Sequence, residues 1–242
     1  MKRAVVMGAS SGIGREVARL LLQQGWCVGV AARRIERLDE LCSAFPQLAV
    51  AETIDVTSQD AAERLRTLID RLGGMDIYIH SSGVGWQNVT LDAELEICTV
   101  VTNGVGFTRM VDAAFQYFRE QNGGHIVAIS SIAGTKGLGP APSYSATKAF
   151  QNTYLESLEQ LSCNLRLGIC ITDIRPGFVD TPLIENTNYP LKLNSQDVAR
   201  QIVKAIVKKR HVCVVDWRYR CLVAIWRMLP RWIWRKLPLC SM

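Results

Sequence analysis

The sequence predicts an α/β fold: a single domain built on a doubly wound parallel sheet with helices on both faces. Short apolar segments alternate with segments of helical period from the N-terminus to about residue 216. The strand-like segments are almost continuously apolar, as in strands that are covered on both faces. No linker divides the pattern, so we assign residues 1–216 to one domain and residues 217–242 to a tail.

The expected elements alternate along the chain and give six or seven parallel strands. The first strand ends at Gly8, apolar residues such as Ile13 and Val17 recur at helical spacing after it, and Gly25 ends that helix. Strands are expected over residues 2–8, 26–32, 48–54, 76–80, 125–130, 166–174 and 212–215. Helices are expected over residues 13–24, 35–45, 58–72, 93–121, 143–162 and 195–209.

The net charge of +6 is concentrated in the tail. Residues 217–242 contain six Arg or Lys and no acid, whereas the 22 basic and 22 acidic residues of 1–216 balance. Four of the six Trp also lie in this tail. Because the cationic character belongs to one short segment, we expect no nucleic-acid partner.

The eight cysteines are scattered, with no C-x-x-C pair and no histidine at metal spacing, so we expect reduced thiols and no metal site. No apolar stretch of about 7–15 residues behind a basic start precedes the first strand, which argues against a secretory signal. A cytoplasmic location is the resulting expectation.

A glycine-rich turn with the spacing G-x-x-x-G-x-G joins the first strand to the first helix. Glycines at such a turn let the backbone approach a pyrophosphate at the positive end of the helix. The alternative is a turn that needs glycine only for its backbone angles. The position directly after an opening strand favours the dinucleotide-binding interpretation. The candidate cofactor contacts in this turn are Gly8, Ser10, Ser11, Gly12, Ile13 and Gly14.

Several further motifs follow in order along the chain. Asp55 and Val56 come after the third strand. Ser131 lies in the segment Ile-Ser-Ser-Ile-Ala-Gly, and thirteen residues later Tyr144 and Lys148 form a Tyr-x-x-x-Lys pair. Together with the glycine turn, these motifs resemble the classical short-chain dehydrogenase/reductase family over essentially the whole predicted domain.

The resemblance implies a Rossmann-type fold with adenine contacts from Asp55 and Val56. It also implies that Asn103, in the long helix, is catalytic and anchors a water that relays protons to Lys148. The segment after the sixth strand matches the one that lines the nicotinamide. Further cofactor contacts implied in this way are Gly83, Tyr144, Lys148, Pro176, Gly177, Val179 and Thr181.

The chemistry of this set also follows from its residue types. Tyr144 and Lys148 lie four apart in a predicted helix, so both side chains project from one face. An ammonium there favours the phenolate and lowers a pKa whose reference value is about 10, so that Tyr144 can act as acid and base. Ser131 would hydrogen-bond the substrate oxygen as charge develops on it. Alone, the pair is also typical of a solvated helix face.

One segment departs from the family pattern. Where the family usually has Asn-Asn-Ala-Gly, this chain has His80-Ser-Ser-Gly83. Gly83 still lets the backbone approach the cofactor closely. His80 and Ser81 can also hydrogen-bond the neighbouring backbone, but their side chains differ in length from the two asparagines of the family. We expect the protein still to bind the cofactor, with changed contacts to its adenosine half. A catalytic base at His80 is the alternative to a structural histidine at the end of a buried strand.

The end of the second strand favours NADP(H) over NAD(H). A site for NAD places an acid near Ala32, where a carboxylate would repel a 2′-phosphate. Here the acid is missing, and Arg33 and Arg34 follow. We expect Arg33 to pair with the phosphate, helped by Ser10 or Ser11. Arg34 is expected only to begin a solvated helix.

NADPH use makes ketone reduction the direction that the resemblance implies. The substrate pocket is expected between the residues after Gly83, the loop 135–142 and a lid over 183–193. The apolar character of these walls, without an Arg or Lys cluster, favours a lipophilic ketone. The candidate substrate contacts are Trp86, Ser131, Tyr144 and Leu183.

The tail has the pattern of an interfacial helix that Pro230 breaks or kinks. An apolar arc opposite Arg220 and Arg227 comprises Trp217, Cys221, Leu222, Ile225, Met228 and Leu229. Trp rings beside cations suit an anionic membrane surface, although the segment is too charged to span a bilayer. In these features the tail resembles those of lipid-ketone reductases such as 3-ketosphinganine reductase. The alternative is that the tail packs on the domain.

Rival functions stay open. A 3-oxoacyl-carrier-protein reductase would need a basic patch by the cleft mouth for its acidic carrier, and a hydroxysteroid enzyme a closed apolar slot. A cofactor-binding regulatory or scaffold protein would need only the glycine turn. The resemblance implies a homodimer or homotetramer through the helices over 93–121 and 143–162. A membrane-bound tail would add a peripheral location on the cytoplasmic membrane face.

Overall fold

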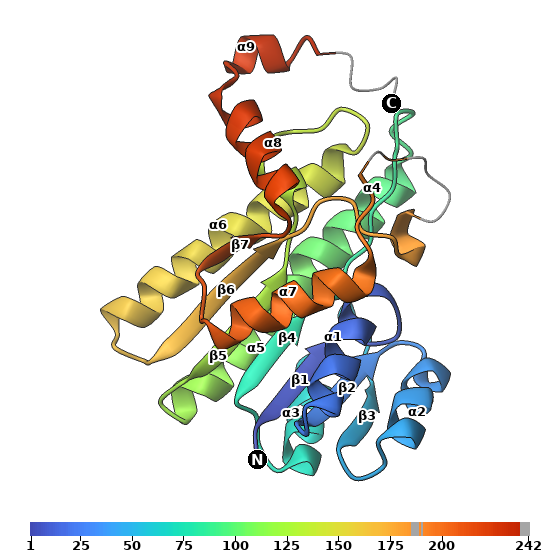
Figure 1. The fold of residues 1–242 in the computed structure, drawn as a ribbon, viewed down its shortest axis with the longest axis vertical. Helices are drawn as coiled ribbons and strands as arrows, with labels where there is room; N and C mark the ends of the chain where they lie inside the picture. Colours follow the sequence, from blue (N-terminus) through green and yellow to red (C-terminus); the bar gives the residue numbers. More distant parts are fainter. Residues whose placement is uncertain (185–188, 190, 238–242) are drawn as a thin grey trace.

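The computed structural model describes residues 1–184, 189 and 191–237. Within them lies one sheet of seven parallel strands in the order β3-β2-β1-β4-β5-β6-β7 (Figure 1). The strand order reverses between β1 and β4, which confirms the expected doubly wound parallel sheet. The strands are β1 (Arg3–Met7), β2 (Cys27–Ala32), β3 (Ala49–Thr53), β4 (Ile77–His80), β5 (Gly124–Ile129), β6 (Ile169–Arg175) and β7 (Val212–Val214).

Helices cover both faces of the sheet, with α1 and α7 in front of it in Figure 1 and α6 behind. One core, with Leu21, Leu38 and Ile202, lies under α1, α2 and α7; the other, with Leu68 and Leu155, lies under α3, α5 and α6. The helices are α1 (Gly12–Gln23), α2 (Ile35–Ala44), α3 (Ala61–Leu72), α4 (Ala93–Val100), α5 (Phe107–Glu120), α6 (Pro142–Asn164), α7 (Ser195–Val207), α8 (Trp217–Met228) and α9 (Arg231–Trp234).

The strands are apolar throughout because each buries side chains on both faces. In β1, Ala4 and Val6 belong to the core under α1 and α7, whereas Val5 and Met7 belong to the core under α3 and α5. All four side chains are fully buried. This double burial is the physical origin of the continuous apolar runs in the sequence.

The long helix expected over residues 93–121 is interrupted. A π-helical turn, η1 (Val101–Gly106), separates α4 from α5. Gly106 in this turn packs directly on Val56: a Cβ at Gly106 would lie 2.8 Å from Val56 Cγ2 and 3.1 Å from its carbonyl oxygen. The wider turn lies where Asn103 faces the site, a common use of such insertions.

The tail packs on the body and also keeps an apolar face outward. Tyr219 and Val223 of α8 are buried in the core under α1 and α7. The Tyr219 hydroxyl accepts from the Phe178 amide at 3.2 Å and donates to the Leu191 carbonyl at 3.0 Å. Trp217 and Met228, on the predicted apolar arc, are 68% and 75% exposed. Pro230 separates α8 from α9, as the sequence predicts.

Three further observations concern the residues that the structure describes. Their cysteines are all free, and Cys240 lies outside the described residues. They contain no group of His, Cys, Asp or Glu arranged to hold a metal ion. None of their helices combines the length and the apolar character needed to cross a membrane.

Candidate active site

The candidate site lies at the carboxyl edge of the sheet, beside the neighbouring strands β1 and β4, between which the strand order reverses. Segments that follow four strands meet there. Gly8 packs on the backbone of Ser81, Gly12 faces the Thr181 side chain, and the Ser131 hydroxyl lies 3.5 Å from the Pro176 carbonyl oxygen. The edge therefore brings together the turn after β1 and the segments after β4, β5 and β6, as expected for a ligand site in such a sheet.

The turn after β1 requires glycine for steric reasons. Gly8 has a φ of +90°, and a Cβ there would lie 2.7 Å from the backbone of Ser81 and Ser82. A Cβ at Gly14 would lie 2.3 Å from the Gly8 carbonyl oxygen. Gly12, with a φ of +55°, leaves 3.1 Å to the Thr181 methyl group. The bare backbone forms a cradle that larger side chains would fill.

The N-terminus of α1 has the features of an anion-binding site. Ser11, the residue before the helix, makes no side-chain capping bond, and the first turn contains no acid. The amides of the first turn, including that of Ile13, therefore keep their partial positive charge for an incoming phosphate. This cradle fits a dinucleotide pyrophosphate.

Arg34, and not only Arg33, belongs to the candidate phosphate site. The Arg34 guanidinium donates to the Ser10 and Ser11 hydroxyls, each at 3.3 Å. The expectation that Arg34 only begins a solvated helix is therefore wrong. The reason is backbone direction: Arg34 is the extended residue before α2, which carries its side chain back across the glycine turn. The role of Arg33 stays a prediction, and its charge acts on Asp55.

Asp55 and Val56 flank the expected adenosine side. Burial raises the pKa of Asp55, but hydrogen bonds from the Thr57 amide and hydroxyl and the charge of Arg33 outweigh it, so the pKa lies below its ordinary value. Val56 is buried, and its carbonyl oxygen accepts from Arg109 at 2.9 Å. Asp55 is thus a fixed carboxylate at neutral pH.

The segment after β6 is fixed from two sides. The Pro176 carbonyl oxygen accepts from the Ile132 amide at 3.1 Å, next to Ser131. Gly177 lies against the ring of Tyr219, where a Cβ would come within 2.2 Å of ring carbon. Val179 is buried and pairs with Leu193. The tail helix α8 thus supports the segment that carries four of the predicted cofactor contacts.

Tyr144 and Ser131 face each other at the mouth of this edge. Burial raises the pKa of Tyr144, a hydrogen bond with Ser131 opposes the effect, and the net pKa lies above the ordinary value for tyrosine. The Ser131 hydroxyl also accepts from the Ala133 amide at 3.0 Å, which fixes its direction. The expected lowering of the Tyr144 pKa by Lys148 is therefore not found in the protein alone.

Lys148 explains this difference. Its Nζ lies 5.7 Å from the centre of the Tyr144 ring, and burial lowers the pKa of the lysine itself to about 8, against the smaller opposing charge of Asp173. The ammonium donates to the Ile129 carbonyl oxygen at 3.1 Å and to Gln151 Oε1 at 3.0 Å. The Lys148 ammonium is thus hydrogen-bonded to Ile129 and Gln151, and it does not lower the pKa of Tyr144 below its ordinary value.

Gln151 links Lys148 to Asn103 and was missed in the sequence. Its amide nitrogen donates to the Asn103 carbonyl oxygen at 2.9 Å while its oxygen accepts from Lys148. The side chain of Asn103 holds both polar backbone groups of Val84, at 2.9 Å and 2.7 Å. The available signal was a polar residue three positions after Lys148, on the same face of a helix.

His80 is enclosed among the side chains at the end of β4. Burial, and next the charge of Lys148, lower its pKa to about 3, so the ring is neutral at physiological pH. Its Nδ1 lies 2.9 Å from the Tyr78 hydroxyl, and the ring packs edge-on against Phe107. The neutral, enclosed imidazole packs beneath the chain segment that leads to Gly83. A Cβ at Gly83 would lie 3.2 Å from Asn103 Oδ1.

The expected substrate walls are only partly described. Gly85 lies flat on Tyr144: a Cβ there would come within 2.3 Å of its ring. Trp86, the residue after Gly85, is 41% exposed, and Leu183 is 46% exposed. Much of the expected lid, residues 185–188 and 190, lies outside the described residues. Tyr189 stacks on Phe178 with ring centres 3.9 Å apart.

A basic cluster that the sequence analysis did not anticipate lies beside the loop 135–142. Lys136 of this loop lines a pocket with three tail arginines, Arg227, Arg231 and Arg235. The sequence separates these residues by about ninety positions, and only the folding back of α8 and α9 brings them together.

Residues 2–191 match the family model described as short chain dehydrogenase. That match covers well over half of the chain. The chain belongs to this family. It is thus an oxidoreductase by family, and the resemblance to the short-chain dehydrogenase/reductase family is confirmed, whereas the resemblance of the tail to lipid-ketone reductases stays a prediction.

Relatives of similar length agree with this assignment. An uncharacterized oxidoreductase of Staphylococcus epidermidis is 34% identical over 218 residues, covering 88% of this chain and 94% of its own. One from Myxococcus xanthus is 34% identical over 239 residues, covering 95% and 93%.

Solved structures of this type share the fold. A variant of the actinorhodin polyketide ketoreductase with NADPH has a TM-score of 0.77 at 26% identity, covering 88% of this chain and 95% of its own. Serine dehydrogenase complexed with NADP+ has a TM-score of 0.76 at 26% identity, covering 88% and 94%. A short-chain dehydrogenase from Sphingobium yanoikuyae, with a TM-score of 0.81 at 20% identity and coverage of 96% and 97%, shares the fold alone.

Proposed function

We propose that this short-chain dehydrogenase is an NADP(H)-dependent reductase that converts a ketone to an alcohol by hydride transfer, with Tyr144 as acid and base. The observation that carries the proposal is the meeting of Ser131 and Tyr144 with buried Lys148 beside the glycine cradle at the carboxyl edge of the sheet. A polar triad at the edge where a dinucleotide fits is the arrangement that carbonyl reduction needs.

The cofactor proposal rests on charge at the glycine turn. Arg34 and the Ser10 and Ser11 hydroxyls offer donors to a 2′-phosphate, and no acid adjoins Ala32 at the end of β2 to repel it. The ketoreductase and serine dehydrogenase structures contain NADPH and NADP+. When bound, the reduced nicotinamide supplies the hydride that the carbonyl carbon accepts.

The side chains of the protein handle the proton. Because its pKa is raised, Tyr144 stays protonated at neutral pH and can donate to the carbonyl oxygen as the alcohol forms. Ser131 donates a second hydrogen bond to that oxygen and stabilises its developing charge. Lys148, with a pKa of about 8, is mostly protonated at pH 7 and stabilises the tyrosinate that remains.

A lipophilic substrate is proposed from the walls and the tail. Trp86, next to the Gly85 that packs on Tyr144, and Leu183, in the segment after β6, are exposed apolar side chains. The exposed apolar arc of α8 would place this opening near a membrane, where long-chain ketones reside. Lipid ketones of the 3-ketosphinganine kind fit this description. We propose that the tail lies on an anionic membrane surface on the cytoplasmic side.

A second candidate is reduction of an acyl chain on an acidic carrier protein. The basic pocket at Lys136 and the tail arginines is the feature that this reaction requires. Turnover of carrier-linked 3-oxoacyl chains well above that of free long-chain ketones would favour it.

We also propose that two copies associate through α5 and α6. An apolar groove beside these helices is lined by Val105 of η1 and Phe150 of α6, which are 50% and 43% exposed. Burying such side chains against a second copy removes apolar area from water. Sedimentation of a Phe150→Glu variant tests this: a smaller assembly is expected, and an unchanged one contradicts the proposal.

The function is tested by NADPH oxidation with small ketones and with long-chain 3-keto lipids in detergent. The wild-type protein is expected to oxidise NADPH faster with the lipid ketones, and Tyr144→Phe to oxidise it with neither. Equal rates on both ketone classes would leave the reductase but contradict the lipid substrate. Because Tyr219 and Val223 are buried in the core, tail variants should be point substitutions and not a truncation.

A further inference from the structure

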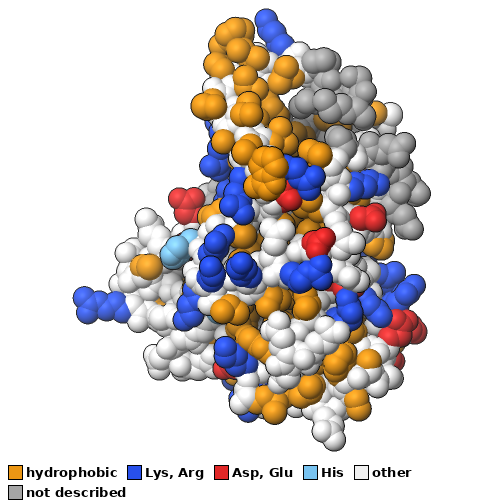
Figure 2. Space-filling model, viewed as in Figure 1, with side chains coloured by type: hydrophobic (Ala, Val, Ile, Leu, Met, Phe, Trp, Pro, Cys, Tyr) orange, Lys and Arg blue, Asp and Glu red, His pale blue; other side chains and the backbone are white. Residues whose placement is uncertain are grey.

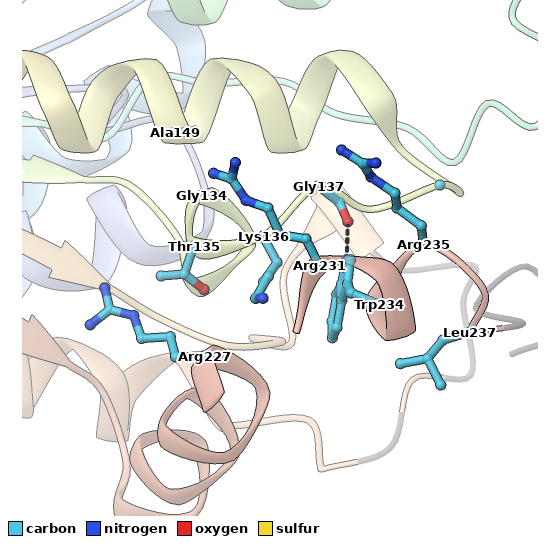
Figure 3. Close-up of a pocket in the computed structure, with 11 residues that line it drawn as sticks. Gly134, Thr135, Lys136, Gly137, Ala149, Arg227, Arg231, Trp234, Arg235 and Leu237 are labelled. Atoms are coloured by element: carbon cyan, nitrogen blue, oxygen red, sulfur yellow. Dashed lines mark hydrogen bonds between the residues drawn. The ribbon is translucent and has the colours of Figure 1, made fainter. Parts of the chain in front are cut away.

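A basic pocket lies between the tail and the loop after Ser131, outside the proposed catalytic machinery. Its volume is about 810 Å³, within the range of small-molecule sites. Its walls come from the loop 134–139, from α6 at Ala149 and from the two tail helices. Figure 3 shows the pocket, with Arg227 at one end and Arg235 at the other.

Four cations line this pocket. Lys136, Arg227, Arg231 and Arg235 all contribute to the wall, and no acid is among the described residues that line it. None of the four forms an ion pair with an acidic residue in the part of the chain that the structure describes. Like charges gathered in this way repel one another, so an anion in the pocket relieves the repulsion.

Specific contacts hold the two sides of the pocket, the loop and the tail, together. Lys136 Nζ donates to the Leu229 carbonyl oxygen at 2.9 Å, between α8 and α9. The indole nitrogen of Trp234 donates to the Gly137 carbonyl oxygen at 2.7 Å, the dashed line in Figure 3. The Lys136 ammonium lies 5.5 Å from the centre of the Trp234 ring, and Trp226 packs edge-on against that ring. These contacts hold the tail against the loop.

Exposed apolar side chains lie on the same two helices. Ile225 and Met228 of α8 are 58% and 75% exposed, and Trp232 of α9 is 65% exposed. In Figure 2 apolar side chains gather over the α8 and α9 region, with basic side chains beside them. Arg227 and Arg231, which line the pocket, adjoin Met228 and Trp232 in sequence.

We propose that this pocket binds the phosphate of an anionic phospholipid while Met228 and Trp232 insert among its acyl chains. This inference rests on the proposed membrane contact of the tail and not on the ketone reduction. Arg231 and Arg235 supply the guanidinium donors that match phosphate oxygens, and Lys136 adds a point charge. A bilayer is favoured over an acidic protein because the exposed apolar side chains need a hydrocarbon phase next to the phosphates.

The test is co-sedimentation of the full-length protein with vesicles. Binding is expected for phosphatidylcholine vesicles that contain phosphatidylglycerol, and much weaker binding for phosphatidylcholine alone. The variant Arg231→Gln/Arg235→Gln is expected to lower the partition coefficient by about 100-fold or more, above the roughly 25-fold that two surface cations would contribute at about fivefold each without a phosphate site. The matched control is Arg220→Gln, which removes a cation of α8 outside the pocket and should lower it by about fivefold or less.

A competition experiment distinguishes a specific phosphate site from diffuse electrostatic attraction to the anionic vesicle. Inorganic phosphate is expected to release the wild-type protein from the anionic vesicles at an ionic strength where chloride does not. Equal release by both salts, or an effect of Arg220→Gln equal per charge to that of the pocket variant, would overturn the proposal. So would capture of an acidic carrier protein by the pocket without any binding to vesicles.

Small-ketone reduction provides the independent readout. The pocket variant should keep the wild-type rate on soluble ketones and the wild-type melting temperature. If the wild-type protein reduces no ketone but the pocket variant still loses vesicle binding, the proposed function fails and the phosphate site stands. If ketones are reduced and vesicle binding is absent, only the phosphate site fails.

Discussion

The carboxyl edge of the sheet and the C-terminal tail differ in whether their polar and apolar side chains find partners within the protein. At the edge, three buried polar residues are partners of one another: Lys148, Gln151 and Asn103 form one hydrogen-bonded chain. In the tail, Arg231 and Arg235 have no acidic partner among the described residues, and Met228 and Trp232 face solvent. A satisfied network positions groups for chemistry, whereas unsatisfied charge and apolar surface indicate an external partner.

The largest expected effect is at Tyr144. Removing its hydroxyl in Tyr144→Phe eliminates the proton donor, and we expect the kcat for ketone reduction to fall by about 10³-fold, since general acids contribute on the order of 10²–10⁴. NADPH affinity, measured by fluorescence titration, should change little. Loss of both activity and NADPH binding would instead assign Tyr144 to the cofactor site alone.

The next effect is at the glycine turn and separates Arg34 from Arg33. Arg34→Ala removes the guanidinium that contacts Ser10 and Ser11, and we expect the KM for NADPH to rise by on the order of 10- to 100-fold, with the KM for NADH nearly unchanged. Arg33→Ala is the matched control. If only the Arg33 variant loses its preference for NADPH, the original assignment to Arg33 is correct.

A smaller effect concerns pH. The pKa of Lys148 is lowered to about 8, so its ammonium is present below that pH and lost above it. We therefore expect kcat/KM for reduction to fall as the pH rises through about 8. In Gln151→Leu the buried ammonium loses an acceptor, so its pKa falls further and the decline should begin at lower pH. An unchanged profile in this variant would show that Gln151 has only a packing role.

The smallest effect is expected in the tail. Met228→Ser removes apolar area that is 75% exposed, so the fold should be unaffected, and we expect turnover of vesicle-borne long-chain ketones to fall about five- to tenfold. The rate on small soluble ketones is the internal control and should not change. A parallel loss on both substrates would mean that the tail supports the catalytic edge itself.

Much of the fold was predictable because its constraints are local. Strands buried on both faces, such as β1, have continuous apolar sequences, and the glycine turn has backbone angles and clearances that only glycine meets. The family motifs also gave the meeting of Ser131 with Tyr144. These features depend on neighbours in sequence or on residues at fixed spacing.

The features that were missed depend on contacts between distant segments. Helical period continues through η1, so nothing local marks the π-turn in which Gly106 packs on Val56. The side chain of Arg34 crosses to another loop, and Gln151 acquires its role only from Asn103, 48 positions away. In α8 the amphipathic pattern gave the exposed arc but not the packing of Tyr219 into the core.

The most direct test of the central proposal is transfer of deuterium from NADPH labelled at its hydride-donating carbon. The wild-type protein should deliver the label to the carbinol carbon of a long-chain 3-keto lipid presented in anionic vesicles, and Tyr144→Phe should not. Folded protein that binds NADPH but leaves the label in place across both small and long-chain ketones would contradict a ketone reductase.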